Sequence, residues 1–223
     1  MESSGPSLRK TIETVDELLF HYLPITQAER EAFSMQILSC QIQSGPEAGL
    51  FSHASLDGDN APRLFSGERI YTQLAARHTL LIDSARILTR LKVSNGAVTR
   101  ALELAKQKME ARCYASFCAV GECRHLTIAF MRYLIACDSP ASNLRLDSFF
   151  MQLAAHREPQ GRWGSFPFYY TLLMLGETGH PLAVQEQYRI SMLCGELLER
   201  SWNKDLYSVR REIILIRARA GDA

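Results

Sequence analysis

Apolar residues recur along most of this chain with the 3.6-residue period of an amphipathic α-helix. No run alternates apolar and polar residues with the period of two that a half-buried strand would show. The pattern predicts about nine helices, separated by breaks rich in Pro, Gly and Ser, over residues 7–22, 26–42, 67–92, 97–117, 122–137, 144–156, 168–176, 182–202 and 206–220. We therefore expect an all-α protein with a single domain over residues 1–223, made of an N-terminal hairpin (1–45) and two-layer helical repeats (67–223).

Three of the predicted helices are more apolar than their neighbours, and they begin near Tyr71, Arg124 and Phe168. Their starts lie about 45 to 50 residues apart, which is the spacing of two-helix repeats. The segments align with one another as ARHTLLIDSARIL, CRHLTIAFMRYLI and PFYYTLLMLGETG, and a more amphipathic helix follows each. A helix that is apolar on nearly all sides is buried on all sides, so this alternation predicts an inner and an outer layer of helices.

The stretch from Phe149 to Leu175 carries the clearest motif of the chain. It contains the end of an amphipathic helix, a loop with Gly161, Trp163 and Gly164, and the start of an apolar helix. A tryptophan in such a loop can fill the gap between successive outer helices and donate its indole N–H to a neighbouring carbonyl. We interpret Trp163 as a structural wedge rather than as a ring that stacks on a ligand.

From about Leu126 to Trp202 the chain resembles the α/α-toroid fold of squalene cyclases and of the β subunits of protein prenyltransferases. The resemblance is carried by an apolar helix, a short break and an outer helix that ends in Gly-x-Trp, here LTIAFMRYLIA, DSPASN and LDSFFMQLAAHREPQGRWG. The glutamine of the family's Gln-Trp motif is missing, and His156 or Arg157 stands near its place. An earlier echo over residues 33–51 keeps Gln41 but has no tryptophan.

This resemblance implies an α/α-toroid-like array of helical hairpins. About four hairpins are too few to complete a ring of six, so we expect an incomplete ring. Its inner helices would then leave an open, concave and partly apolar face.

Charge and composition exclude several classes of protein. Lys and Arg (25) nearly balance Asp and Glu (24), so no strong net field draws the chain to nucleic acid. No window approaches the roughly 18 apolar residues of a membrane span, and the N-terminal segment lacks the features of a signal peptide. The six cysteines fit reduced core thiols better than a disulfide framework, and we expect a cytoplasmic protein.

Metal sites receive little support from the sequence. The relatives implied by the resemblance use an Asp-rich acid motif or a zinc ion, whereas the nearest string here, Asp57-Gly58-Asp59-Asn60, has first of all the composition of a turn. Cys113, Cys118, Cys123 and His125 cluster in sequence, but five-residue steps along one helix rotate by about 500°, so successive thiols would point apart. We therefore expect no metal and no cofactor.

A candidate ligand site follows from the repeat. If the inner helices start at the same end, the pairs Arg77-His78 and Arg124-His125 converge near one rim and offer a cationic patch to a carboxylate or phosphate. Aromatic side chains on the inner helices would line the same cavity; those that we single out are Tyr71, Tyr133, Tyr169 and Tyr170. The alternative is structural, with Arg and His capping helix carbonyls or reaching solvent, and with the rings filling the core.

Two functions remain open. The first is a non-catalytic binding module for a hydrophobic small molecule or a protein partner, which includes a second copy in a homodimer. The second is an enzyme that acts on an isoprenoid diphosphate or another lipid-like substrate, with the Arg/His rim and the carboxylates of Asp57 and Asp59 holding the diphosphate. The missing Asp-rich string and the missing zinc spacing favour the first.

Overall fold

A computed structural model describes residues 7–51, 62–200 and 205–220 of the chain. Within these ranges the protein is helical, and the prediction of an all-α fold of helical hairpins is confirmed. The helices are α1 (Leu8–Phe20), α2 (Gln27–Ser39), α3 (Gln73–Leu91), α4 (Gly96–Glu110), the 3-10 helix η1 (Cys113–Ser116), α5 (Cys123–Cys137), α6 (Pro140–Ala155), α7 (Phe168–Gly176), α8 (Pro181–Leu198) and α9 (Leu206–Ala220). No helix in the described ranges has the length and apolar character that crossing a bilayer requires.

Side-chain caps set several helix starts. Thr26 forms a capping box with Glu29 at the start of α2, and the Asn95 side chain accepts a hydrogen bond from Val98 N–H (2.8 Å) at the start of α4. Several predicted boundaries are wrong. The helix expected from residue 144 already begins at Pro140, with Ser139 as its cap, so most of the predicted break DSPASN is helical, and the helix expected to reach residue 42 ends at Ser39. The helix expected from residue 67 begins only at Gln73, because residues 62–70 fold back on themselves. The helix expected over 97–117 ends at Glu110.

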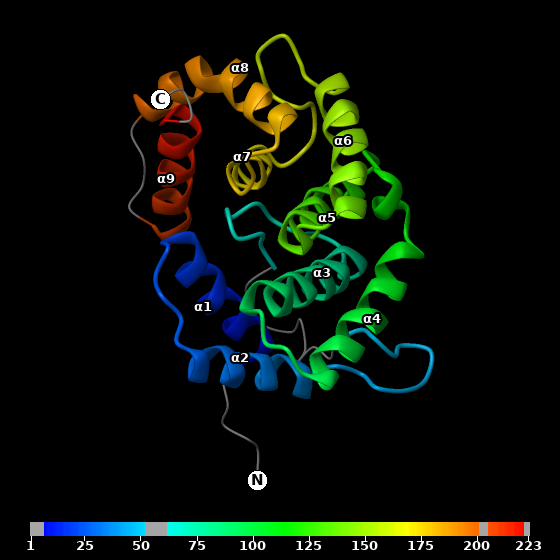
Figure 1. Ribbon diagram of the computed structural model, residues 1–223. Coiled ribbons are helices and arrows are strands. Elements are labelled where there is room, and N and C mark those ends of the chain that lie inside the picture. The colour runs from blue at the N-terminus through cyan, green and yellow to red at the C-terminus, as the bar shows by residue number, and fades with distance from the viewer. Residues whose placement is uncertain (1–6, 52–61, 201–204, 221–223) are drawn as a thin grey trace.

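The helices form two layers (Figure 1). The inner layer contains α1, α3, α5, α7 and α9, each packed against the next along the chain or joined to it by side chains. The outer layer contains α2, α4, α6 and α8. Burial follows the layers: α5 buries side chains all around, whereas α2 buries only Ser34 and Ile37. The three apolar segments singled out in the sequence are α3, α5 and α7, and they stand side by side.

The inner helices run in the same direction. The Glu122 carboxylate, at the start of α5, accepts hydrogen bonds from Tyr71 N–H (2.5 Å) and Thr72 N–H (2.8 Å) at the start of α3. Glu68 accepts from Tyr169 N–H (3.0 Å) and Tyr170 N–H (3.2 Å) at the start of α7. Glu68 thereby satisfies two first-turn N–H groups of α7, which have no partner within the helix, and Glu122 binds the two residues immediately before α3. Both carboxylates stand near the positive end of a helix dipole, which is favourable.

The segment 62–72 closes this N-terminal end of the ring. It crosses the middle of the ring in Figure 1, with Leu64 and Ile70 buried. Gly67 lies in the left-handed region (φ 93°), and a Cβ there would come within 2.7 Å of the Tyr207 side chain on α9. The segment therefore covers the end of the ring at which the inner helices start.

Each loop that follows an outer helix is bonded to the next outer helix. After α2, the buried Gln41 side chain donates to Ala101 O on α4 (2.9 Å). After α4, Ala115 O accepts from Arg145 on α6 (2.5 Å). These bonds fix the rotation of each hairpin relative to its neighbour.

Trp163 makes the corresponding connection after α6. Its ring is buried (1% exposed), and its indole N–H donates to the Glu186 carboxylate on α8 (2.9 Å), which also pairs with Arg157 (2.7 Å). The interpretation of Trp163 as a wedge is confirmed, although its acceptor is a carboxylate instead of a carbonyl. Arg157, near the position of the missing glutamine, shares that acceptor.

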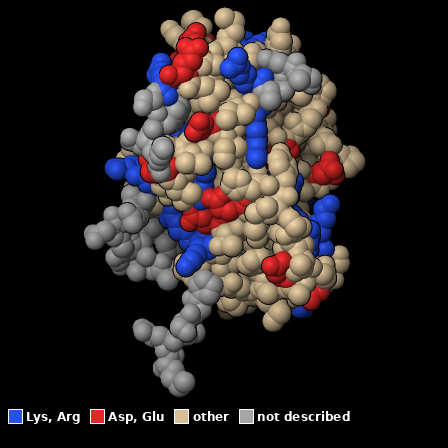
Figure 2. Space-filling model, turned by 90° about the vertical axis from the view of Figure 1, so that its left-hand side faces the viewer, with Lys and Arg blue, Asp and Glu red and all other residues tan. Residues whose placement is uncertain are grey.

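The ends of the inner layer meet through side chains. Arg210 on α9 is buried and donates to Glu17 (2.6 Å) and Glu13 (2.9 Å) on α1 and to Phe65 O (2.9 Å). Figure 2 shows the face where α9 meets α1, with acidic and basic side chains interspersed. The array has fewer hairpins than a ring of six, as expected. The contacts of Arg210 nevertheless join α9, the last inner helix, to α1, the first one. The open concave face that we expected is thereby reduced to an enclosed ring with a pocket.

Removal of the Arg210 guanidinium should loosen this seam. We expect Arg210→Met, which keeps the apolar stem, to lower the free energy of unfolding by about 2–3 kcal/mol in urea denaturation. This is less than the 3–5 kcal/mol typical of a broken buried pair, because Glu13 and Glu17 are partly exposed. Arg219→Met, at an exposed position of the same helix, should change it by less than about 0.5 kcal/mol. Equal effects of the two substitutions would contradict the role of Arg210.

Candidate functional site

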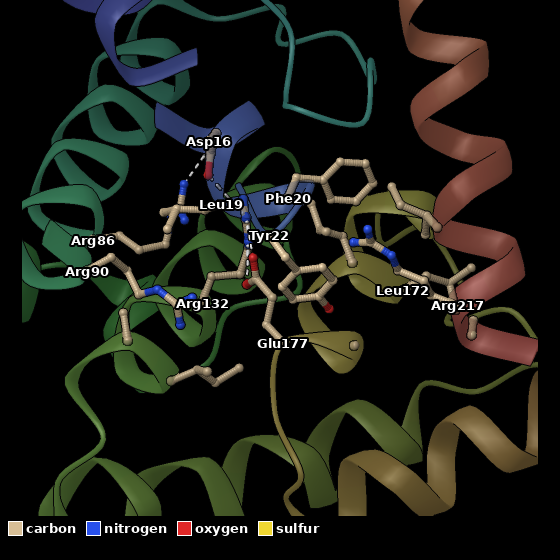
Figure 3. Close-up of a pocket in the computed structure, with 16 residues that line it drawn as sticks. Asp16, Leu19, Phe20, Tyr22, Arg86, Arg90, Arg132, Leu172, Glu177 and Arg217 are labelled. Carbon is tan, nitrogen blue, oxygen red and sulfur yellow. Dashed lines mark hydrogen bonds and ion pairs between the residues drawn. The ribbon is translucent and has the colours of Figure 1, made fainter. Parts of the chain in front are cut away.

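A cavity of about 130 Å³ lies where the C-terminal ends of the five inner helices meet (Figure 3). All five helices contribute to its wall. The lining residues are Asp16, Leu19, Phe20, Tyr22, Arg86, Arg90, Arg132, Ile135, Ala136, Leu172, Leu173, Gly176, Glu177, Ile214, Arg217 and Ala218. Charged groups thus stand beside a wall of aliphatic side chains from α7 and α9.

The inner side of the cavity is held by a buried ion network. The Asp16 carboxylate on α1 pairs with Arg86 on α3 (2.5 Å) and lies 3.7 Å from Arg132 on α5. All three side chains are almost completely buried. Burial raises the pKa of Asp16, but the positive charges of Arg86 and Arg132 outweigh burial and hold that pKa below its usual value. Asp16 is therefore ionised at neutral pH.

Arg132 is the most connected residue of this network. It forms a two-pronged pair with Glu177, just after α7, with Nε and Nη2 at 2.8 and 2.5 Å from the carboxylate oxygens. Its Nη1 donates to the buried Tyr170 hydroxyl (3.1 Å). Arg86 also donates from Nε to Asp83 (3.4 Å), one turn earlier on α3, so both arginines are held by carboxylates of the protein.

Arg90 and Arg217 have no such partners. Neither makes an ion pair or a side-chain hydrogen bond within the residues that the structure describes. Arg217 lies over the rings of Phe20 (4.3 Å) and Tyr22 (4.8 Å). In Figure 3 the two arginines extend towards the cavity from α3 and α9, on opposite sides of the view. Two guanidinium groups at this cavity therefore keep unused donors.

Tyr22 occupies a strained position at the mouth of the cavity. It follows α1 with φ 54°, and the bonds Leu23 N–H to Leu18 O (2.8 Å) and Tyr22 N–H to Leu19 O (3.2 Å) form a Schellman-type helix end. Glycine is favoured there, and a side chain costs about 1 kcal/mol. The tyrosine is nevertheless present, 77% exposed, with its ring beneath Arg217. Strain of this kind is often retained at functional sites.

The cavity has a positive formal charge. Four arginines line it against two carboxylates, Asp16 and Glu177. The C-terminal ends of the helices contribute negative partial charge, which explains why arginines are favourable here and offsets part of their field. The arrangement suits a small anion that replaces water on Arg90 and Arg217.

Comparisons with protein families, with curated proteins and with solved structures found no match for this chain. The resemblance to squalene cyclases and prenyltransferase β subunits therefore stays a prediction.

The residues that the sequence suggested as a cationic rim do not line this cavity. Arg77 pairs with Glu47 (2.5 Å) on the outside of the ring, and His78 is buried against the Tyr114 hydroxyl (3.1 Å). The inner helices do start at one end, as expected, but that end is closed by residues 62–72. Arg77 and Arg86 lie nine residues apart, which is about 180° around a helix, so Arg77 faces outward when Arg86 faces inward.

The remaining predicted ligand residues are dispersed. His125 lies 4.0 Å from Glu122, and the buried Nε of Arg124 has no hydrogen-bond partner among the described residues. Tyr71 is 77% exposed, Tyr133 is buried near Phe130, and Tyr169 lies under Arg211. Tyr170 alone of the eight touches the network, through Arg132. Asp57 and Asp59 lie outside the described residues.

The prediction that the three clustered cysteines lie on one helix with their thiols pointing apart is wrong. Cys113, Cys118 and Cys123 are not on one helix, because α4 ends at Glu110 and α5 begins at Cys123. Their sulfur atoms all lie within 4.8 Å of one another, and His125 does not join them. Burial, together with the hydrogen bond from Cys113, raises the pKa of Cys123 to about 12, so its free thiol is not an activated nucleophile.

Acid should destabilise the protein through His78. Burial, with the nearby charges of Arg112 and Arg77, lowers the pKa of His78 from 6.5 to about 4, so the folded state holds a neutral imidazole. The stability that this residue contributes is complete above pH 6.5 and is lost as the pH falls towards 4. Between pH 4 and 6.5 the wild type should bind up to one more proton on unfolding than the His78→Gln variant does. The number of protons is obtained from the pH dependence of the unfolding free energy, measured by urea denaturation at a series of pH values.

The comparison is made with the wild type under the same conditions, because His78→Gln removes one imidazole and no other titratable group. An unchanged pH dependence in His78→Gln would contradict the assignment of a neutral, buried His78.

Proposed function

We propose that this protein is a non-catalytic binding module that takes a small organic anion in the cavity at the C-terminal end of its inner helices. The ligand would carry one carboxylate or phosphate group and a short apolar or aromatic part. The observation that carries the proposal is the pair of arginines, Arg90 and Arg217, which face the cavity without ion-pair partners among the described residues.

The anionic group matches the donors of the two free guanidinium groups. Charge-assisted hydrogen bonds from arginine to a carboxylate or phosphate are shorter and stronger than neutral ones, and arginine can donate two of them side by side. Arg86 and Arg132 support the site indirectly, because Asp16 and Glu177 neutralise them and hold them in place. The free arginines then supply the positive charge that the ligand meets.

The rest of the ligand would contact the aliphatic side of the cavity. Leu172 and Leu173 on α7 and Ile214 and Ala218 on α9 are buried there with little exposed surface. Tyr22 could cover the mouth, since its ring is exposed and already stacked with Arg217. A pocket with an apolar wall and a few convergent polar groups is the usual form of a small-molecule site.

The size of the cavity separates this proposal from the enzyme alternative. A volume of about 130 Å³ falls below the roughly 300–1,000 Å³ of pockets that enclose drug-sized ligands. A long isoprenoid chain would not fit without rearrangement of the inner helices. Among the described residues that line the cavity, both carboxylates, Asp16 and Glu177, are paired with arginines, so neither is free to act as an acid.

Binding can be tested by thermal unfolding and calorimetry at constant ionic strength. Phosphate, sulfate, acetate, benzoate and farnesyl diphosphate are compared with chloride. We expect benzoate or phosphate to raise the melting temperature, since a ligand at a hundred times its Kd stabilises by about 2.7 kcal/mol. Arg90→Gln and Arg217→Gln should each weaken binding by about tenfold or more, because each removes a charge-assisted hydrogen bond.

Arg100→Gln, on the exposed face of the outer helix α4, is the matched control and should bind like the wild type. The proposal fails if no anion stabilises the wild type more than chloride does, or if the Arg90/Arg217 double variant binds with unchanged affinity. Farnesyl diphosphate binding far more tightly than phosphate would instead favour the isoprenoid enzyme.

A further inference from the structure

A second site lies at the other end of α5, away from the cavity. Cys123 is the first residue of α5, whereas Ile135 and Ala136 of the cavity wall are twelve or thirteen residues further on. At 1.5 Å per residue the two ends are about 18 Å apart along the helix axis. The thiol cluster therefore shares no residue with the cavity.

The geometry points to a metal site: we propose that Cys113, Cys118 and Cys123 bind one thiophilic metal ion, Zn²⁺ in the first place, through three thiolates. The three sulfurs lie within 4.8 Å of one another, and Cys113 and Cys123 approach to 3.5 Å. Three sulfurs on a tetrahedral Zn²⁺ with Zn–S bonds of about 2.3 Å are about 3.8 Å apart. Shifts of a few tenths of an ångström up to one ångström convert the observed cluster into that arrangement.

Two turns of the backbone and two hydrogen bonds bring the three cysteines together. After η1 the chain turns at Phe117, whose φ of 66° is unusual for a bulky residue, and again at Gly121 (φ 50°). The buried hydroxyl of Thr127 then fixes Cys118 from both sides. It accepts from Cys118 N–H (3.1 Å) and donates to Cys118 O (2.8 Å). The convergence therefore rests on a strained turn and a buried anchor.

The chemistry of binding balances without a further reactant. Each thiol loses its proton to solvent as the metal binds, so Zn²⁺ and three thiols give a complex of formal charge −1 and three protons. Arg112 and Arg124 flank the cluster in sequence, and the buried Nε of Arg124 has no hydrogen-bond partner in the described residues.

The fourth coordination position would be open. Among the described residues, no other His, Cys, Asp or Glu brings a ligand atom into the group. Cys113 is exposed, so the site is accessible from solvent. Water or a small external ligand would complete a tetrahedral zinc ion, as in sites with three protein ligands.

The test uses the full chain, reduced and freed of metal with a chelator. Zn²⁺ affinity is measured by competition with a chromophoric chelator, and Co²⁺ is used as a spectroscopic probe of thiolate coordination. We expect one metal per chain and thiolate-to-cobalt charge-transfer absorption. Each of three substitutions should weaken Zn²⁺ binding by more than a hundredfold: Cys113→Ser, Cys118→Ser and Cys123→Ser. Loss of a residue that only positions a metal ligand typically weakens binding by about ten- to hundredfold.

Matched variants separate coordination from general effects on the fold. Cys40→Ser and Cys137→Ser should bind Zn²⁺ like the wild type. Thr127→Val, which keeps all three thiols but loses the anchor of Cys118, should weaken binding by about ten- to hundredfold, and Thr127→Ser should restore it. Circular dichroism confirms that each variant is folded, and the exposed position of Cys113 makes Cys113→Ser the safest of them.

Three results would overturn the proposal. The first is a folded, reduced wild type that takes up no metal at micromolar concentrations. The second is unchanged affinity in the variant that lacks all three thiols. The third is a reduced protein that binds no metal but forms a disulfide between Cys113 and Cys123 when it is oxidised by air. That result would identify these two cysteines as a redox pair.

Discussion

The ion pair between Asp16 and Arg86, extended by Arg132, is the interaction on which the arrangement of the inner helices depends. A buried charge is tolerated only when it is paired, and loss of one partner typically costs about 3–5 kcal/mol. Asp16 comes from α1, Arg86 from α3 and Arg132 from α5, so one carboxylate ties three inner helices together. Glu177 adds the end of α7 through Arg132. The network therefore limits how far α1, α3, α5 and the end of α7 can rotate or slide, and it engages two of the four arginines at the cavity.

Because the inner helices run in the same direction, the two ends of the ring differ: one is covered by residues 62–72, and the other contains the cavity. Glu122 and Glu68 accept backbone hydrogen bonds at the helix starts of one end, where residues 62–72 cross the ring. At the other end the negative ends of the helix dipoles gather, and arginines are the side chains that such an end favours. Outer helices then lock the ring from outside, because each loop after an outer helix is bonded to the next one. Architecture and charge pattern are thus consequences of the same parallel stacking.

Apolar periodicity was sufficient to predict the two layers of helices. It did not predict the cavity, which depends on single charged residues within the apolar segments. The helices α3, α5 and α7 were predictable because their apolar residues cover nearly all sides. The cavity was not, although Arg132 within LTIAFMRYLIA and Arg86 within LLIDSARIL were a usable signal: an arginine surrounded by apolar residues on a buried helix must have a buried partner. Asp16 gives no such signal, since it stands in an ordinary amphipathic helix. The repeated Arg-His pairs attracted attention by their similarity, yet Arg77 faces away from the ring.

The thiol cluster shows the limit of reasoning from spacing. Five-residue steps separate the thiols only while the helix continues, and the chain leaves the helix at Glu110. A left-handed Phe117 is not predictable from residue preference, because such a conformation is stabilised by tertiary packing, here of its ring against Phe149 and Phe166. Helix ends are decided by such contacts more than by the local pattern.

A double-mutant cycle on Asp16 and Arg86 measures how strongly this ion pair couples α1 to α3. The free energies of unfolding of the wild type, Asp16→Ala, Arg86→Met and the double variant are measured by urea denaturation. If the pair holds α1 against α3 as the structure indicates, the two substitutions couple by about 2–3 kcal/mol, because both remove the same contact, and Arg86→Met has an additional cost from the lost bond to Asp83 (3.4 Å). Additivity within about 0.5 kcal/mol would show that the two side chains act independently, and would contradict the account.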